Sequence, residues 1–323
     1  MIEVRTPCRL HFGLLAYSHD DARQFGGVGL MIHRPDLTVR FRESDELRAV
    51  GPMAERAELF ARRFLDRAQL EGLTLPAAAI EVLRIPRAHV GLGTGTQLGL
   101  AIAQGLCELG GLPAMPAPRL AQWVGRGERS AIGVHGFAHG GLIVEGGKLD
   151  PDAVSPLLLR HELPEPWRIV LVIPEQLRGL SGQRERDAFA RMPAIPPAAS
   201  GGMCRHVLLG LIPALIEGDL DDFGRALYEL QRTVGECFAQ AQGGIYGDPL
   251  LERIVGFVRA RGVHGVGQSS WGPTLYAFTR DEPEAQRLAE AIRKEFRLSP
   301  GEVFVTRPEN RGASVHKPMG NAV

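Results

Sequence analysis

The stretch that most constrains the fold lies between residues 85 and 109, where a glycine-rich loop runs directly into an apolar helix. Glycine occupies every second position of this loop, at Gly91, Gly93 and Gly95. Without side chains in the way, backbone N–H groups can converge on an anion, and the positive end of the helix dipole adds to the attraction. Further donors are the side chains of Thr94, Thr96 and Gln97. The loop therefore predicts a phosphate or pyrophosphate site.

The spacing of this loop excludes two common phosphate motifs. No Lys-Ser or Lys-Thr pair follows the glycines, and the position three after Gly93 is Thr96 instead of the third glycine of a dinucleotide fingerprint. The helix is supported by apolar residues spaced three and four apart, namely Leu98, Ala101, Ile102, Gly105, Leu106 and Leu109. A tight turn that only caps a buried helix is the alternative that these residues leave open.

The charge of the chain is balanced, with 37 basic and 37 acidic residues. This balance argues against a broad nucleic-acid surface but allows a local basic pocket. We expect no membrane span, because no apolar run approaches the roughly 20 residues required, and a cytoplasmic location, because the N-terminus lacks a signal-peptide core. The four cysteines are scattered without a CxxC pair, which predicts free thiols.

Periodicity predicts an α+β fold in two domains, residues 1–163 and 164–323. The strands expected are 2–10, 28–42 with a break at Pro35, 78–85, 141–145, 168–173, 274–279 and 302–307. The helices expected, besides the one after the glycine loop, are 53–70, 119–129, 203–217, 219–240, 248–261 and 282–296. Asp219 is the expected N-cap of the helix at 219–240.

The first of four further polar stretches contains Arg9 and His11, followed by the glycine pair Gly26 and Gly27. Alternate residues of a strand point the same way, so Arg9 and His11 share a face. A cation beside an imidazole suits a phosphate or a carboxylate. A surface arginine and a core histidine are the alternative.

The second stretch offers Arg129 and Ser130 as an anion clamp. His135 and His139 follow, but the residues between them do not predict a helix and a zinc site would lack a third ligand.

The third stretch, a polar loop after a strand, offers Arg178, Ser181 and Glu185. The fourth is a second glycine-rich turn, with Gln268, Ser269, Ser270 and Trp271; Trp271 is suited to stacking on an aromatic or sugar ring.

These stretches occur in an order that resembles the GHMP kinase superfamily. PRAHVGLGTGTQLGLA is similar to its central motif P-x-x-x-G-L-G-S-S-A, TPCRLHFGLL to its N-terminal motif and GVGQSSWGPTLYAF to its C-terminal glycine motif. Within the superfamily, the chain resembles the β-ribofuranosylaminobenzene 5'-phosphate synthases. The segments that carry this resemblance are RLHFGL, FGGVGL, ERSAIGVHGFAHGGLIVEGG, RGLSGQRERDAF and GQSSWGPT.

The resemblance implies an N-terminal mixed domain with a left-handed-crossover type of sheet and a C-terminal ferredoxin-like domain. It implies a pentosyltransferase that condenses phosphoribosyl pyrophosphate with 4-aminobenzoate or 4-hydroxybenzoate. Pyrophosphate and carbon dioxide are released, and the product leads to methanopterin-type carriers. Mg²⁺ is expected with the pyrophosphate, although the sequence identifies no metal ligands. A homodimer is expected because two-fold dimers are the commonest assemblies.

One departure from the base-dependent kinases of the superfamily concerns their S-G-I-D stretch. The corresponding residues are Ser130 to Gly133, so glycine stands where the base aspartate is expected. Phosphoryl transfer through such a base would lose its proton acceptor. A kinase that works without a base and a non-catalytic ligand sensor on the same fold are the alternatives to the synthase.

The resemblance also implies roles for the site residues. The pyrophosphate is assigned to Gly91, Gly93, Thr94, Gly95, Thr96 and Gln97. The walls of the aromatic pocket are assigned to Gln268, Ser269, Ser270 and Trp271. Closure over the ribose is assigned to Arg178, Ser181 and Glu185. Catalytic contacts are assigned to Arg9, His11, Gln268 and Ser269, and substrate contacts also to Gly26, Gly27, Arg129 and Ser130.

Arg9 is expected beside a phosphate and His11 beside the aromatic acid, because a strong ion pair with the departing carboxylate would stabilise the ground state. We predict that Arg9→Ala raises the KM for phosphoribosyl pyrophosphate in steady-state kinetics. An unchanged KM would contradict this assignment.

Overall fold

The computed structural model describes residues 1–18, 23–179 and 182–317, with only the backbone described at 182–186. The strands are β1 (Ile2–Ala16), β2 (Phe25–Glu43), β3 (Arg48–Val50), β4 (Ala78–Arg84), β5 (Leu142–Glu145), β6 (Leu157–His161), β7 (Arg168–Val172), β8 (Val266–Gln268), β9 (Leu275–Thr279), β10 (Val303–Thr306) and β11 (Ser314–His316). The helices are α1 (Ala54–Leu70), α2 (Thr94–Leu109), α3 (Ala117–Trp123), α4 (Ile132–His139), α5 (Gly182–Arg191), α6 (Pro197–His206), α7 (Ile212–Glu217), α8 (Leu220–Gln242), α9 (Pro249–Arg259) and α10 (Glu282–Phe296).

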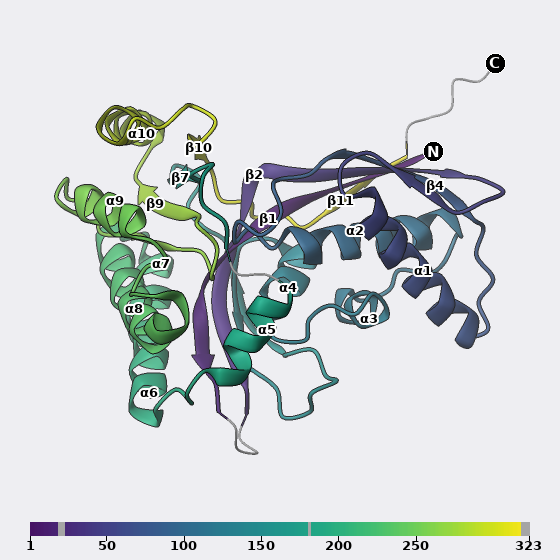
Figure 1. The fold of residues 1–323 in the computed structure, drawn as a ribbon, viewed down its shortest axis with the longest axis horizontal. Helices are drawn as coiled ribbons and strands as arrows, with labels where there is room; N and C mark the ends of the chain where they lie inside the picture. Colours follow the sequence, from purple (N-terminus) through teal and green to yellow (C-terminus); the bar gives the residue numbers. More distant parts are fainter. Residues whose placement is uncertain (19–22, 180–181, 318–323) are drawn as a thin grey trace.

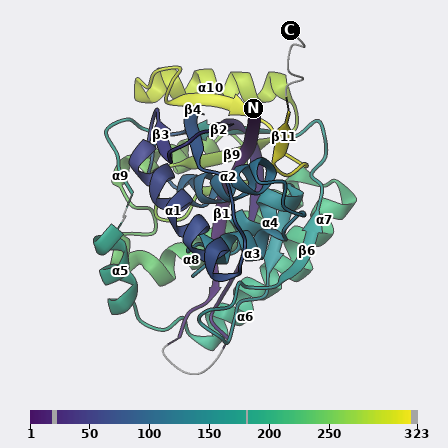
Figure 2. The same ribbon diagram turned by 90° about the vertical axis from the view of Figure 1, so that its right-hand side faces the viewer.

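The first sheet is built on β1 and β2, two long antiparallel strands that pair from Ile2–Phe41 to Ala16–Phe25. Its order is β11-β1-β2-β4-β3, and β5 and β6 continue it from β2. Helices α1 to α4 lie on one side of this sheet (Figures 1 and 2). The apolar face of α2 packs against β1 and β2, which places the glycine loop at the edge of the buried core.

The second sheet has the antiparallel order β10-β7-β9-β8. In chain order this is 4-1-3-2, the arrangement of the ferredoxin-like fold, so the structure confirms the expected fold class. Alternate residues of β7 point to opposite faces: Ile169 and Leu171 join the core that contains α8, whereas Val170 and Val172 join the core that contains α9 and α10.

The long strands connect the two sheets. The far half of β1 packs against α8 and α6, so one hydrophobic core spans both halves of the molecule (Figure 1). The chain also returns to its start, because β11 pairs with β1. The domain boundary between residues 163 and 164 stays a prediction. Among the described strands, those before the boundary form the first sheet and those after it form the second, except that β11 joins the first.

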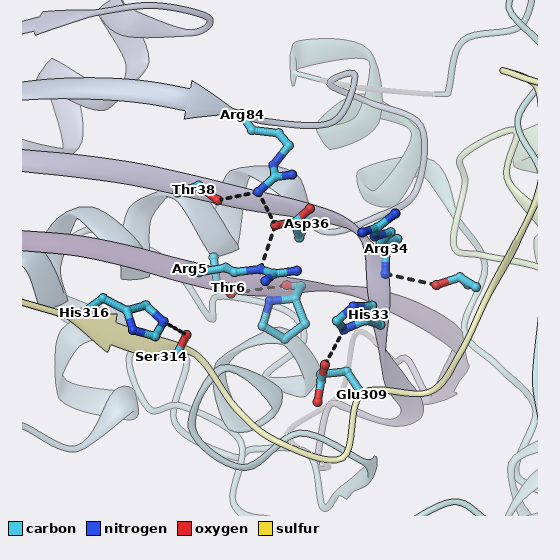
Figure 3. Close-up of polar contacts among 12 residues, drawn as sticks. Arg5, Thr6, His33, Arg34, Asp36, Thr38, Arg84, Glu309, Ser314 and His316 are labelled. Carbon is cyan, nitrogen blue, oxygen red and sulfur yellow. Dashed lines mark hydrogen bonds and ion pairs between the residues drawn. The ribbon is translucent and has the colours of Figure 1, made fainter. Parts of the chain in front are cut away.

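Polar contacts at the middle of β2 fix the neighbouring strands and the C-terminal segment (Figure 3). The buried Asp36 carboxylate pairs with Arg5 of β1 at 2.9 Å and with Arg84 of β4 at 3.1 Å. His33 contacts Glu309 at 2.7 Å, which holds the stretch after β10 against β2. The expected break at Pro35 was wrong: β2 continues through it, with a shift of register opposite Pro7 and Cys8.

Two helix predictions in the first half need correction. The helix expected at 119–129 ends at Trp123, so Arg126 and Arg129 lie in the following loop. Residues 132–139 do form a helix, α4. Its glycines permit close packing, because a Cβ at Gly136 would lie 2.2 Å from the sulfur of Met31. Burial by neighbouring elements thus outweighs the low helix propensity of glycine.

The apolar helical run from Pro197 to Glu217 comprises α6, a π-helical turn and α7. The sequence predicts a helix only from residue 203 and predicts no run near membrane-spanning length, whereas the run begins at Pro197. Among the described residues this run does have the length and hydropathy of a span, although a third of its most apolar window is buried inside the protein. Because it packs against α8, it is weak evidence for a membrane segment.

Two helical glycines predict opposite effects of the same substitution. A Cβ at Gly105 of α2 would lie 2.2 Å from the ring of Phe41, whereas a Cβ at Gly256 of α9 meets nothing within 4 Å. Gly105→Ala should lower the free energy of unfolding by about 1–3 kcal/mol through overpacking. Gly256→Ala should raise it by about 0.5–1 kcal/mol. Chemical denaturation measures both; equal effects would contradict the packing described.

Candidate active site

A pocket of about 810 Å³ opens where the glycine loop meets β1, the 125–130 loop, α5, α8 and the turn after β8. Its lining combines residues from both halves of the chain, and therefore neither sheet forms it alone. One part of the lining is rich in arginine and the other in aromatic rings.

Close backbone packing explains two glycines of the loop. Gly91 has a φ of 91°, and a Cβ there would lie 2.3 Å from the carbonyl oxygen of Ser269. Gly93 has a φ of 69°, and its Cβ would lie 2.5 Å from the side chain of Arg9. Both positions therefore exclude larger residues.

The N-terminus of α2 faces the pocket. Its first backbone hydrogen bonds run from Thr96 and Gln97 to the carbonyl oxygen of Gly93, so the N–H groups of Thr94 and Gly95 precede the helical ladder. Both residues line the pocket. Arg126 donates from Nε and Nη2 to the Thr96 hydroxyl, at 3.3 and 3.2 Å. An anion here would meet helical N–H groups and a guanidinium together.

Charge in the pocket is strongly unbalanced although the whole chain is neutral. The arginines of the lining are Arg9, Arg56, Arg63, Arg126 and Arg129. Glu128 is the one carboxylate among the described lining residues. Five guanidinium groups against one carboxylate give a positive field that attracts a multiply charged anion.

An aromatic group forms the other part of the pocket. Trp271 stacks on Phe189 with ring centroids 4.4 Å apart and contacts Phe238 edge-on at 5.6 Å. The guanidinium of Arg129 lies 4.3 Å from the centre of the Phe189 ring. Arg129 therefore joins the basic and aromatic parts, and the faces of the Phe189 ring are covered by Trp271 and by Arg129.

His11 begins a buried hydrogen-bond chain at the pocket wall. Its Nε2 lies 3.0 Å from the Ser130 hydroxyl, which donates to Glu145 at 2.7 Å; the N–H of Ala131 donates to the second oxygen of Glu145 at 2.6 Å. Burial, assisted by the charge of Arg9, lowers the pKa of His11 well below its ordinary value. Burial raises the pKa of Glu145 despite its hydrogen bonds.

The turn after β8 anchors the glycine loop to β1. The Ser269 hydroxyl accepts from the N–H of His11 at 3.0 Å and donates to the carbonyl of Gly91 at 2.7 Å. Thr274 donates to the carbonyl of Val90 at 2.6 Å, and the N–H of Ser270 donates to the carbonyl of His11. The C-terminal half thereby fixes the geometry of the phosphate-loop candidate.

The structure brings together most of the residues that the sequence predicted. Those that line the pocket are Arg9, His11, Gly91, Gly93, Thr94, Gly95, Thr96, Arg129, Ser130, Gln268, Ser270 and Trp271. Their roles toward a ligand stay predictions.

Several predicted residues lie elsewhere. Gln97 is fully buried behind the loop, where it bonds Thr6 and donates to the carbonyl of Gly133 at 2.8 Å. Its side chain is therefore not a donor to the pocket. Ser269 lies behind the lining, where its hydroxyl bonds His11 and Gly91. A Cβ at Gly27 would lie 3.3 Å from Glu145 and 3.5 Å from His11, so the glycine allows these two side chains to pack against the strand. Gly26 and the exposed Arg178 do not line the pocket. Ser181 and the side chain of Glu185 lie outside the described residues.

Five further residues of the site were not predicted from the sequence: Glu145, Phe189, Arg56, Arg63 and Glu128. Glu145 ends a short apolar strand, and an acidic residue at the buried end of LIVE was an available signal. Arg56 lies on the charged side of α1, where nothing in the helical pattern distinguishes it from its neighbours. Only the path of the chain brings Phe189, Arg56 and Arg63 to the pocket and Glu145 behind Ser130.

The fold is that of the GHMP kinases. A family model described as "GHMP kinases C terminal" matches residues 211–298. Homoserine kinase from Cytophaga hutchinsonii superposes with a TM-score of 0.72 at 18% identity, covering 98% of this chain and 97% of that one. Mevalonate diphosphate decarboxylase from Staphylococcus aureus superposes with a TM-score of 0.66 at 11% identity, covering 98% and 99%. At such identities these likenesses show the fold alone.

Sequence comparison identifies the family. The chain is 34% identical to a protein of Methanothermobacter thermautotrophicus named beta-ribofuranosylphenol 5'-phosphate synthase, over 97% of this chain and 98% of that protein. It is also 34% identical to the protein of the same name from Archaeoglobus fulgidus, over 98% and 99%. The chain belongs to the β-ribofuranosylphenol 5'-phosphate synthase family.

Removal of the Ser269 hydroxyl tests the anchor of the glycine loop. Ser269→Ala leaves the buried N–H of His11 without this acceptor, which should lower the free energy of unfolding by about 1–3 kcal/mol. The matched control is Ser44→Ala, because the Ser44 hydroxyl only accepts from Glu46 at the surface; its effect should stay within about 0.5 kcal/mol. Equal effects in chemical denaturation would show that the hydroxyl is not an anchor.

Proposed function

We propose that the protein joins phosphoribosyl pyrophosphate to 4-hydroxybenzoate, releasing pyrophosphate and carbon dioxide and forming 4-(β-ribofuranosyl)phenol 5'-phosphate. The bond between C1 of the ribose and the pyrophosphate oxygen breaks. A carbon–carbon bond forms between C1 and the ring carbon that carries the carboxylate, and this carboxylate then leaves as carbon dioxide. The name of the relatives supports the phenol over the aniline as product.

The observation that carries this proposal is the two-part pocket. A donor with a phosphate and a pyrophosphate matches the arginines and the α2 N-terminus. A planar aromatic acid matches the rings of Phe189, Phe238 and Trp271. The two parts adjoin at Arg129, which contacts the Phe189 ring. The reacting carbons would therefore meet at the boundary between them.

Catalysis in this pocket needs no protein nucleophile. As the C1–oxygen bond breaks, negative charge grows on the pyrophosphate, and fixed guanidinium and N–H groups stabilise that charge without reorganising. Arg126 and the N–H groups of Thr94 and Gly95 are the candidates for this task. The pocket must also hold the aromatic ring over C1 and exclude water from the cationic sugar.

Mg²⁺ fits this site through Glu128. Mg²⁺ is commonly held by one or two carboxylates together with substrate phosphates, and Glu128 is the carboxylate that the described lining offers. No group of three metal-binding side chains occurs among the described residues. A bound Mg²⁺ would neutralise part of the charge on the leaving pyrophosphate.

Phosphoryl transfer is less supported as the function. Gly133 lies in α4 where base-dependent kinases are expected to place an aspartate, and its Cα packs beside Gln97 and Thr96. A Cβ there would lie 3.2 Å from Gln97 Nε2, so the position is filled by the loop helix.

The proposal predicts turnover without ATP. With phosphoribosyl pyrophosphate, Mg²⁺ and 4-hydroxybenzoate labelled in its carboxyl carbon, we expect labelled carbon dioxide and pyrophosphate in equal amounts. The matched control is 3-hydroxybenzoate, which should release neither, because its hydroxyl cannot donate electrons to the carbon that carries the carboxylate. ADP formation from ATP with an alcohol would favour the kinase, and binding without turnover would favour the sensor.

A further inference from the structure

We propose that Glu145 is the end of a proton path that starts at His11 and passes through the Ser130 hydroxyl. The path lets a buried histidine accept a proton from the substrate hydroxyl without becoming charged. The inference rests on the proposed function for its substrate, whereas its geometry stands on the hydrogen-bond chain alone. His11 would contact the substrate, and Glu145 would act through Ser130 as a positioning residue.

With Glu145 ionised, the hydrogen bonds of the Ser130 hydroxyl follow one arrangement. The hydroxyl has a single proton, which it donates to Glu145 at 2.7 Å. Its oxygen is 3.3 Å from the N–H of Ile132 and 3.0 Å from His11 Nε2. When Glu145 is ionised, the hydroxyl proton is directed to the carboxylate, and His11 then donates from Nε2. The neutral ring then keeps its lone pair on Nδ1.

A second arrangement uses the same heavy-atom positions. If Glu145 carries a proton and donates it to Ser130, the hydroxyl turns and donates to His11 Nε2. His11 then carries its proton on Nδ1. The N–H of Ala131 is satisfied in both cases, because it bonds the other oxygen of Glu145 at 2.6 Å. The chain therefore couples the protonation of Glu145 to the tautomer of His11.

The proposed reaction uses both arrangements. The phenol hydroxyl gives its proton to His11 Nδ1, the Nε2 proton passes to Ser130, and the Ser130 proton passes to Glu145. The electrons left on the phenol oxygen support attack of the para carbon on C1, giving a dienone. Loss of carbon dioxide returns an electron pair to the ring, and the resulting phenolate recovers its proton by the reverse path. Protons and electrons balance without a further reagent.

The electrostatic surroundings agree with this path. Burial and the nearby Arg9 charge lower the pKa of His11, so an imidazolium is strongly disfavoured. Burial raises the pKa of Glu145, although hydrogen bonds from Ser130, Ala131 and Ser155 and the charge of Arg9 oppose the rise. A proton that enters through His11 is therefore better held on Glu145 than on the imidazole.

Glu145→Gln tests the coupling directly. The glutamine oxygen must face the N–H of Ala131, so its NH₂ group faces Ser130 and the hydroxyl turns toward His11. Two-bond ¹H–¹⁵N spectra of the ligand-free protein should show His11 changing from the Nε2–H to the Nδ1–H tautomer. The resonances are assigned by their loss in His11→Asn. This readout does not depend on the reaction that the protein catalyses.

The same variant should lose at least about 100-fold in kcat, the usual contribution of general acid–base catalysis, with both KM values unchanged because Glu145 contacts no substrate. Ser130→Ala should lose a similar factor, and Ser130→Thr, which keeps a hydroxyl, should recover activity. The matched control is Glu309→Gln. Glu309 contacts His33 at 2.7 Å (Figure 3), and neither residue lines the pocket. This substitution should change neither the His11 tautomer nor kcat.

Two results would overturn the proton path. One is an unchanged His11 tautomer in a folded Glu145→Gln protein, and the other is a changed tautomer with full kcat. Absence of pyrophosphate release by the unaltered protein would instead contradict the proposed function and leave the tautomer test valid.

Discussion

The hydroxyl of Ser269 is the contact on which the site depends. It joins the N–H of His11 on β1 to the carbonyl of Gly91 in the glycine loop, and it belongs to a turn of the C-terminal half. The loop can come so close only because Gly91 has no side chain. Loop, strand and C-terminal sheet are therefore held in one arrangement, and the pocket exists only when all three are in place.

Concentrated positive charge is the second constraint. A chain with no net charge places five arginines around one pocket and one carboxylate among them. Like charges repel, so this arrangement stabilises an anionic ligand more than it stabilises the fold itself. The aromatic rings next to it bring no charge, and they provide a separate surface for a planar partner.

The chain shares its fold with homoserine kinase and mevalonate diphosphate decarboxylase. The fold leaves the chemistry open, and the side chains decide it. Gly133 removes the expected base position from α4. A carboxylate is present instead at Glu145, where burial and the Ser130 hydroxyl set its hydrogen bonds.

Elements with strong periodicity and motifs with close spacing are predictable from the sequence alone. The helix after the glycine loop, the Asp219 N-cap and the C-terminal strands follow from residues near one another in the chain. Most of the residues predicted from local patterns do line the pocket, among them Arg9 and His11 of β1 and Trp271 of the glycine-containing turn after β8. Local patterns wrongly predicted a pocket donor at Gln97, whose side chain is buried behind the loop.

Residues that are distant in the sequence form one site only because the tertiary structure brings them together. Glu145, Phe189 and Arg56 come from a strand and two helices that are far apart in sequence, and no local pattern relates them. Helix α4 forms despite its glycines because packing against Met31 and Gln97 rewards small residues there. Local spacing therefore specified the phosphate-loop candidate, whereas long-range packing specified the aromatic wall, the basic field and the proton path.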